Sequence, residues 1–280
     1  MPAPVAPAES FAPMSGAQRQ PAITFEDVSI AFEGNPVLDG ISFVLERGET
    51  KALLGVAGSG KSTILKLTMG LVKPDRGNIW VLGEEVSAMK EEDLFELRRK
   101  IGMVFQESAL FDSLSVRDNV AYRLIEEDVP EEKVQTRVAE ALRFVELEHT
   151  LNMFPGELSG GMRRRVAIAR AIVDQPEVLL YDSPTGGLDP VTSTTIIELI
   201  VKQRDVYHTS SLLVSHRLQD AFTMATHYFD RTQNRMVPVN EAPIDTRTSF
   251  LVLRDGKVIF DGSAHELASS RDEYIREYIS

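Results

Sequence analysis

One short segment constrains the fold of this chain more than any other. The letters GVAGSGKS, from Gly55 to Ser62, fit the phosphate-binding pattern G-x-x-x-x-G-K-[ST] at every fixed position. The apolar run Ala52–Leu54 precedes the segment, and a predicted helix from Ser62 to about Met69 follows it. The pattern requires this strand–loop–helix setting, so we predict a P-loop rather than an ordinary glycine-rich turn.

The predicted P-loop has the chemistry of an ATP site. Its glycines allow backbone N–H groups to turn toward phosphate oxygens, and the N-terminus of the following helix adds a favourable potential. Lys61 is expected to reach the β- and γ-phosphates, and the Ser62 hydroxyl is expected to bind Mg²⁺. The residues predicted to contact the nucleotide here are Gly55, Gly58, Ser59, Gly60, Lys61, Ser62 and Thr63.

An acidic residue ends a second apolar run. Val178–Asp182 reads as a buried strand with the carboxylate of Asp182 at its end. Alone, an aspartate at a strand end is usually a turn residue. Together with a P-loop it predicts a second magnesium ligand, because P-loop proteins hold Mg²⁺ with such a residue.

The composition excludes several classes of protein. The formal net charge of −12 argues against a protein that wraps nucleic acid, because such a protein needs a basic surface. The chain has no cysteine, which excludes disulfides and thiolate metal sites. No run reaches the roughly 18–20 apolar residues that cross a bilayer, so a membrane role would need another subunit to do the crossing.

The hydrophobic patterns predict a mixed α/β fold. Alternating residues from Ile23 and a turn at Glu33–Pro36 predict a small antiparallel sheet. Strands and helices that alternate from Gly160 onward predict a parallel sheet with helices on both faces. Near the C-terminus, Arg254-Asp255-Gly256 predicts a hairpin, and a final helix is expected over His265–Ile279.

The same patterns predict the domain division. Residues 1–20, rich in Ala, Pro and Ser and without a secretory pattern, are predicted to be a flexible tail. One ATPase domain is expected over 21–264, with a helical subdomain at about 107–160, and a C-terminal helix over 265–280. Residues 231–249 lack periodicity and are interpreted as an insertion, either disordered or in contact with a partner subunit.

Further segments give the chain a resemblance to ABC ATPases over about Ile23 to Gly262. In the order and spacing of that family, they are Gln106 after Met103-Val104-Phe105, the signature-like Leu158-Ser159-Gly160-Gly161-Met162, the D-loop-like Gly187-Leu188-Asp189 and the switch-like Val214-Ser215-His216. The resemblance implies an α/β fold, a P-loop NTPase of ABC type. Its central sheet would be mostly parallel, with an antiparallel β subdomain and a helical subdomain.

The family resemblance also implies a head-to-tail pair of ATPase chains with two ATP molecules between them. Ser159, Gly160 and Gly161 would then face the γ-phosphate of the ATP held by the partner, with the amides of the helix that they open. Asp189 would lie at the same interface. Gln106 would contribute to the magnesium site, and Gln106, Asp182 and His216 would order the reacting groups.

Two further features of the sequence each have two possible interpretations. Phe32, at the tip of the first predicted hairpin, resembles the aromatic residue that stacks on adenine, or it is an ordinary packed strand residue. The run Arg163-Arg164-Arg165 is expected to be a solvated helix face rather than a ligand site.

Among ABC subunits, the chain is most similar to the MCE-linked (Mla-type) lipid-transport ATPases. The similar segments are Phe105–Asp112, Val116–Tyr122, Met162 in the signature and the C-terminal Tyr274–Tyr278. The resemblance implies a membrane permease that binds a groove formed by Gln106–Tyr122, with Leu110 and Phe111 either as contacts or as core residues. It also implies an MCE substrate-binding protein as a further partner, no nucleic acid, and a place on the cytoplasmic face of the inner or plasma membrane.

The chain departs from the family pattern at Ser183. ABC ATPases normally have a glutamate after the Walker B aspartate, and a serine hydroxyl cannot act as a base near neutral pH without an activating partner. We expect an ATPase that is slow, because positioned general bases contribute about 10²–10⁴-fold. The alternatives are an ATP-binding clamp that does not hydrolyse, or pairing with a different chain whose glutamate is intact.

Other functional classes remain as alternatives. A soluble ABC protein of translation or DNA repair typically carries tandem ATPase domains or a long coiled-coil insertion, and this sequence has neither. A metabolic kinase would share the P-loop but not the LSGGM segment or the histidine after a strand.

Overall fold

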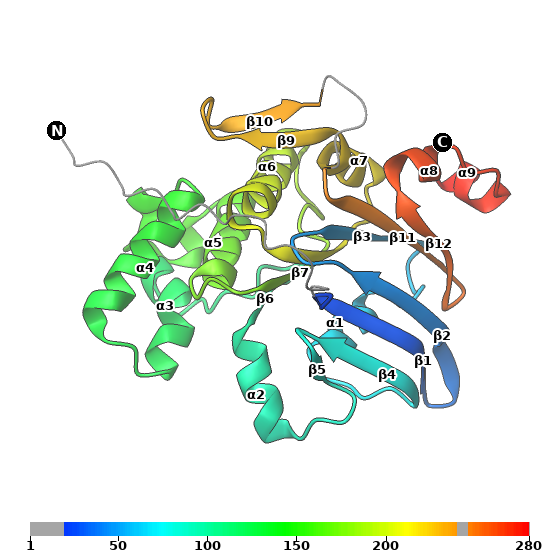
Figure 1. Ribbon diagram of the computed structural model, residues 1–280. Helices are drawn as coiled ribbons and strands as arrows, with labels where there is room; N and C mark the ends of the chain where they lie inside the picture. The colour runs from blue at the N-terminus through cyan, green and yellow to red at the C-terminus, as the bar shows by residue number, and fades with distance from the viewer. Residues whose placement is uncertain (1–19, 240–245, 280) are drawn as a thin grey trace.

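A six-stranded sheet forms the centre of the computed structural model, which describes residues 20–239 and 246–279 (Figure 1). The strand order is β12-β11-β3-β8-β7-β6, in which only β12 is antiparallel to its neighbour. The strands are β3 (Thr50–Leu54), β6 (Ile101–Val104), β7 (Val178–Asp182), β8 (Ser210–Val214), β11 (Thr248–Arg254) and β12 (Lys257–Ser263). The predicted mostly parallel central sheet is confirmed.

Both faces of this sheet are covered by apolar side chains. Along β3 and β7 the side chains alternate, so that Leu53 and Leu180 enter one hydrophobic cluster and Leu179 enters the other. The first cluster includes α1 (Lys61–Thr68) and α2 (Glu91–Arg99), and the second includes α5 (Gly160–Ile172), α6 (Pro190–Tyr207) and α7 (Leu218–Thr226). The elements around the predicted P-loop are therefore anchored in two cores.

A second, antiparallel sheet lies beside α1 (Figure 1). Its order is β2-β1-β4-β5, with β1 (Ile23–Phe32), β2 (Asn35–Leu45), β4 (Arg76–Val81) and β5 (Glu84–Glu85). The predicted turn is shorter than expected, because Glu33 and Gly34 alone form it, with φ values of 52° and 81°. Two residues of positive φ match the twist of a hairpin, so Asn35 already belongs to β2. The other predicted hairpin turns at Asp255-Gly256.

The segment 107–160 holds α3 (Val116–Glu126), α4 (Glu131–Phe144) and two 3-10 turns, η1 (Glu148–Thr150) and η2 (Pro155–Glu157). These elements lie on the left of Figure 1, and we call residues 107–160 the helical lobe. Asn119 is completely buried in α3 and accepts a hydrogen bond of 2.8 Å from the Phe111 backbone N–H. Its amide also donates to the carbonyl oxygens of Phe111, Leu114 and Ser115, so it fixes the loop before α3.

Two segments differ from the prediction. Within the expected insertion 231–249, Arg235–Pro238 form the strand β10, which pairs with β9 (His227–Asp230), and β9 packs against α6. The expected single C-terminal helix is two helices, α8 (Ala264–Ala268) and α9 (Glu273–Ile279). The Asp272 side chain accepts a hydrogen bond from the Ile275 N–H, which starts a new helix and competes with continuation of α8.

Some predictions fall outside the described residues. These are the tail, apart from Gln20, positions 240–245 of the insertion, and Ser280 at the end of the predicted C-terminal helix. Over 20–239 and 246–279, no helix has both the length and the apolar character needed to cross a membrane.

The buried strand β7 generates a stability prediction. Tyr181 has no solvent exposure, its hydroxyl has no hydrogen-bond partner among the described residues, and burial raises its pKa. Because an unpaired buried hydroxyl is costly, we expect Tyr181→Phe to raise the free energy of unfolding by about 1 kcal/mol, measured by urea denaturation. The exposed Tyr207→Phe is the control and should leave stability unchanged. A Tyr181→Phe protein less stable than the parent would contradict the prediction.

Candidate functional site

Four predicted site segments meet at one edge of the central sheet because their strands run parallel. β3 leads into the P-loop, β6 leads to Gln106, β7 ends at Asp182, and β8 is followed by His216. The carboxyl ends of parallel strands form the usual binding edge of an open α/β sheet. The topology thus brings together residues that are up to 161 positions apart, from Gly55 to His216.

The P-loop requires glycine at two of its fixed positions. Gly60 has φ of 99°, and a β-carbon there would lie 2.4 Å from Leu38 Cδ2 of β2. Gly55 has φ of 142°, and its β-carbon would lie 2.4 Å from the carbonyl oxygen of Leu253 in β11. At Gly55 the close atom belongs to the backbone and cannot move aside, and at Gly60 the positive φ would strain any other residue, so both positions favour glycine strongly. The loop is packed between the two sheets.

Lys61 lies inside this loop. It is 4% exposed, and its Nζ donates to the carbonyl oxygens of Gly55 (2.8 Å) and Val56 (2.7 Å) and to Ser59 Oγ (3.2 Å). Burial lowers the pKa of Lys61, and the charge of Asp182 partly offsets that shift. The ammonium group therefore sits within the backbone cradle where phosphate oxygens would bind.

Ser62 and Asp182 form a candidate magnesium site. Ser62 Oγ donates to Asp182 Oδ1 over 3.3 Å, which joins the start of α1 to the end of β7. Within the described part of the chain, no three His, Asp or Glu side chains are arranged so that they could hold a metal ion together. Mg²⁺ is commonly bound by one or two protein oxygens together with substrate phosphates and water, so this small oxygen set fits it.

Gln106 and Ser183 lie close to one another. A β-carbon at Gly186 would lie 3.6 Å from Gln106 Cγ and 3.5 Å from Ser183 Cβ. Ser183 has φ of 47° and is 3% exposed, and its hydroxyl has no hydrogen-bond partner within the residues described. The position expected to polarise water therefore holds a short hydroxyl that is shielded from solvent.

His216 is exposed at the end of β8, in a segment held by contacts that the sequence did not suggest. Thr185 Oγ1 donates to the buried Asp220 Oδ2 at 2.5 Å, and Arg217 Nη1 donates to Ser193 Oγ at 2.6 Å. These bonds tie the segment after β8 to the turn after Asp182 and to α6. No local pattern marks Thr185 or Asp220, because their pairing depends on tertiary placement.

The signature-like segment opens α5 at the surface. Ser159 is the N-cap residue, and its hydroxyl accepts a hydrogen bond of 3.2 Å from the Met162 N–H. Ser159 and Gly160 are exposed, and no hydrogen bond joins Ser159, Gly160 or Gly161 to Lys61 or Ser62 in the described structure. Their predicted contact with a partner's nucleotide stays a prediction.

Asp189 caps α6 next to this segment. Its carboxylate accepts hydrogen bonds from the backbone and hydroxyl of Thr192, which lower the pKa of Asp189. Thr192 also contacts the signature, since a β-carbon at Gly161 would lie 2.4 Å from Thr192 Cγ2. The beginnings of α5 and α6 are therefore in direct contact.

Two sequence interpretations are decided by exposure. Phe32 is 43% exposed at the end of β1, so it is not a packed strand residue, and its stacking on adenine stays a prediction. The arginine run is not a uniformly solvated face. Arg164 is 5% exposed and donates to backbone oxygens near Gln106 and Ser183, and this corrects our expectation.

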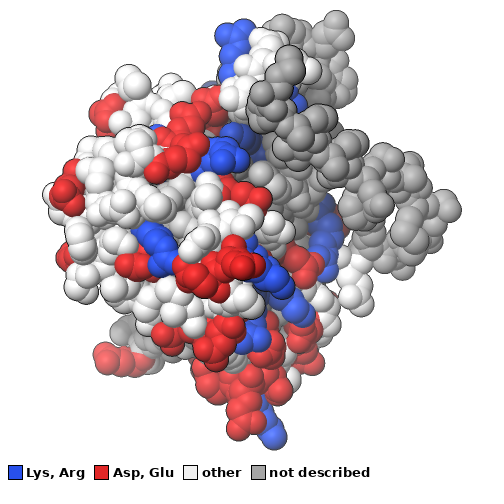
Figure 2. Space-filling model, turned by 90° about the vertical axis from the view of Figure 1, so that its left-hand side faces the viewer, with Lys and Arg blue, Asp and Glu red and all other residues white. Residues whose placement is uncertain are grey.

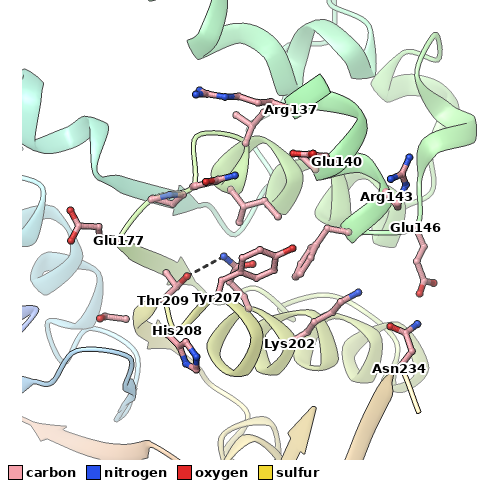
Figure 3. A pocket seen from close by; sticks show the side chains of 18 of the residues that line it. Arg137, Glu140, Arg143, Glu146, Glu177, Lys202, Tyr207, His208, Thr209 and Asn234 are labelled. Carbon is pink, nitrogen blue, oxygen red and sulfur yellow. Dashed lines mark hydrogen bonds between the residues drawn. The ribbon is translucent and has the colours of Figure 1, made fainter. Parts of the chain in front are cut away.

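A cavity of about 1050 Å³ lies at the opposite edge of the sheet (Figure 3). It is lined by α4, α6 and the residues that precede β7 and β8, among them Glu177 and Thr209. Lys202 Nζ lies 4.8 Å from the ring centroid of Phe144 there. None of the predicted site residues lines this cavity.

Comparison with known families and sequences gives consistent matches. Residues 38–186 match the family described as "ABC transporter". The chain is 37% identical to the chloroplastic protein TRIGALACTOSYLDIACYLGLYCEROL 3 of Arabidopsis thaliana over 91% of this chain and 72% of that protein. It is 32% identical to the intermembrane phospholipid transport system ATP-binding protein MlaF of Escherichia coli K12, over 92% of this chain and 88% of that protein.

Solved structures agree with these matches. A dimeric bacterial ABC transporter cassette is 28% identical, with a TM-score of 0.71 over 86% of this chain and 98% of that chain. The protein cbiO1 of Clostridium perfringens, part of an ABC transporter complex, is 28% identical, with a TM-score of 0.74 over 92% and 94% of the two chains. The predicted fold class is confirmed over most of the chain.

The contact between α5 and α6 generates a prediction. We expect Gly161→Ala to lower the free energy of unfolding by about 1–3 kcal/mol, because its methyl group overlaps Thr192 Cγ2. Thr192→Ser removes that methyl group, and the remaining Thr192 atoms would lie 3.6 Å away, so the double variant should recover most of the loss. Urea denaturation of the two single variants and the double variant measures this. If Gly161→Ala lowers the free energy of unfolding by the same amount in the parent protein and in the Thr192→Ser protein, the proposed contact is refuted.

Proposed function

Because the chain belongs to the ABC transporter family of ATP-binding domains, we propose that it hydrolyses ATP with Mg²⁺ at the P-loop edge and drives lipid transport through closure of a dimer. The observation that carries the proposal is the meeting of Lys61, Ser62 and Asp182 at the carboxyl edge of the parallel sheet. Three groups suited to phosphate and magnesium come together there from two separate elements.

The proposed reaction is transfer of the γ-phosphoryl group of ATP to water. The water oxygen bonds to the γ-phosphorus, the bond from that phosphorus to the bridging oxygen breaks, and ADP leaves with the electron pair. Lys61 would neutralise the phosphate charge, and Gln106 and His216 would orient the reacting groups. Mg²⁺, held through Ser62 and Asp182, would supply further charge neutralisation.

Ser183 sets the expected rate. Its hydroxyl is shielded and is no acceptor for the proton of the attacking water, so the proton would leave to phosphate or solvent. Positioning by Gln106, His216 and the partner chain's Asp189 residue would remain. Loss of a general base reduces rates by about 10²–10⁴-fold, which supports a slow ATPase.

A second candidate function is an ATP-binding clamp that closes without hydrolysis. The hydroxyl of Ser183, which is shielded and has no hydrogen-bond partner over 20–239 and 246–279, favours it, because the clamp needs the P-loop and the signature but no base. The same arrangement fits a heterodimer in which this chain's signature completes the site of a partner that retains its glutamate.

The surface around the ATP edge supports pairing with a second ATPase chain. Val191, beside Asp189, is 78% exposed, and Val56 in the P-loop is 50% exposed. In the proposed pair, these two exposed apolar side chains would be covered by the partner chain, which would remove apolar surface from water. In the proposed head-to-tail pair, the exposed N-terminus of α5 would cover the partner's ATP, and the partner's α5 would cover this one.

The helical lobe supports docking of a membrane permease. Phe111, on the loop that Asn119 fixes, is 43% exposed, and Tyr122 of α3 is 40% exposed. Their ring centroids lie 4.7 Å apart. Leu110 instead packs against the core. Of the two predicted contacts, we therefore propose Phe111 as the docking residue.

Charge around this lobe also fits a membrane subunit. Figure 2 shows acidic side chains gathered over the lower part of the face that includes the helical lobe. Separately, the first turn of α2 carries Glu91, Glu92 and Asp93, and an ion pair of 3.0 Å between Arg99 and Glu127 joins α2 to the end of α3. Cytoplasmic loops of membrane proteins carry an excess of Lys and Arg, so such a loop complements this surface.

The two curated relatives suggest the cargo. MlaF is named as the ATP-binding protein of a phospholipid transport system, and it aligns with nearly the whole of this chain. We propose a lipid as the transported substrate, an MCE substrate-binding protein as a further partner, and a peripheral place on the cytoplasmic face of the membrane.

Steady-state hydrolysis of ATP tests the proposed activity. We expect slow turnover by the native chain above the Lys61→Ala blank, and an increase of about 10²-fold or more in Ser183→Glu. If Ser183→Glu hydrolyses ATP and the native chain does not, the result favours the ATP-binding clamp. If ATP binding, measured by fluorescence of a labelled nucleotide, is also absent from the native chain, the proposal fails.

Capture of the membrane subunit tests the docking residue. Affinity-tagged chain should co-purify a multi-spanning protein from detergent-solubilised membranes of its source cells, and Phe111→Glu should reduce the yield at least about tenfold by burying a charge in the contact. Tyr228→Glu, a change at a 39% exposed residue of β9, is the matched control. Equal yields from the two variants would contradict the assignment.

A further inference from the structure

α5 carries a buried arginine that the proposed reaction does not use. Arg164 is 5% exposed, and burial lowers its pKa. Its hydrogen-bond partners are one hydroxyl and four main-chain oxygens. A guanidinium group removed from water needs most of its donors paired, so this set of acceptors is an organised site.

The acceptors belong to two different loops at the ATP edge. On the β7 side, Nη1 donates to the carbonyl oxygens of Ser183 at 3.0 Å and Pro184 at 2.8 Å, and Nη2 donates to Gly186 at 3.4 Å. On the β6 side, Nη2 donates to the carbonyl oxygen of Gln106, and Nε donates to Ser108 Oγ at 3.3 Å. One side chain thus bridges the segment after Asp182 and the segment that carries Gln106.

Both loops have backbone conformations that need support. Ser183 has φ of 47°, and Ser108 and Ala109 have φ of 63° and 47°. Such conformations persist in non-glycine residues when surrounding contacts determine them. Arg170 also donates to Ser108 and Ala109, but it does not reach the segment after Asp182, so the bridge between the loops belongs to Arg164.

We propose that Arg164 is a positioning residue that holds Gln106 and the turn after Asp182 in a fixed relation to each other and to the signature helix. The inference rests on the proposed function, because it gives the bridge a role in ordering the groups that react with ATP. The planar fork of arginine reaches both loops at once, whereas the single ammonium group of a lysine cannot. A displacement of the start of α5 by a partner would therefore move both loops together.

The absence of cysteine from the sequence makes a site-specific probe available. Glu107→Cys places one thiol next to Gln106 at an exposed position, where a nitroxide spin label reports loop mobility by electron paramagnetic resonance. The mobility of the spin label is measured in the Glu107→Cys protein that keeps Arg164, and in Glu107→Cys combined with Arg164→Gln or with Arg164→Lys. Arg165→Gln is the matched control, because Arg165 lies on the same helix but donates to the carbonyl oxygen of Val145 in the helical lobe, at 3.1 Å.

We expect both Arg164 variants to make the label more mobile and the Arg165 control to leave it unchanged. In steady-state hydrolysis, kcat should fall about tenfold while KM for ATP stays within about twofold, because the P-loop is untouched. Urea denaturation identifies any variant that fails to fold. If Arg164→Gln does not fold, the label mobility of Arg164→Lys, which keeps the positive charge, decides whether the inference holds. Arg164→Lys should not restore the rigid label, whereas a purely electrostatic role would restore it.

The two measurements separate this inference from the proposed activity. If the native chain shows no turnover, hydrolysis is refuted, while the label still decides whether Arg164 holds the loops. Unchanged label mobility in both folded Arg164 variants would overturn the inference. Increased mobility with unchanged kcat in an active chain would also overturn it, since the bridge would then be only structural.

Discussion

Parallel pairing of β3, β8, β7 and β6 is the constraint on which the rest of the structure depends. It brings the P-loop, Gln106, Asp182 and His216 to one edge, although each follows a different strand. The pairing is maintained by two hydrophobic clusters, one on each face of the sheet. Loss of that register would separate Ser62 from Asp182, so the site exists only while the central sheet is correctly assembled.

The loops at this edge are held differently from the strands beneath them. Hydrogen bonds between side chains, or from side chain to main chain, fix their positions, as in the pairs Thr185–Asp220 and Arg217–Ser193. These hydrogen bonds can break and form with other partners without disturbing the hydrogen bonds between the strands. A single apolar strand, by contrast, cannot move without disrupting the packing of its neighbours. The molecule thus combines a rigid sheet with an edge whose geometry is set by a few polar contacts.

The sequence was sufficient for the parts of the fold and site that have local signatures. The strand–loop–helix setting of the P-loop, the strand ending at Asp182 and the antiparallel sheet that begins at Ile23 follow from spacing and periodicity, and the structure agrees with them. Arg164 could not be recognised in this way, because a run of three arginines on a helix has the pattern of a solvated face. Four of its five acceptors are main-chain oxygens, which every residue has, so only the tertiary structure identifies them. The break between α8 and α9 depends similarly on one capping contact of Asp272.

The acidic surface near the helical lobe has a consequence for how such a subunit behaves near a bilayer. The cytoplasmic leaflet is negatively charged, and it attracts basic segments and repels acidic ones within about a Debye length. The formal net charge of the chain is −12, and the first turn of α2 carries Glu91, Glu92 and Asp93, so the net interaction of the chain with such a leaflet is repulsive. Under the proposed function, attachment to the membrane would then depend on contact with the membrane subunit, so the amount of this chain on the membrane would report the number of complete complexes.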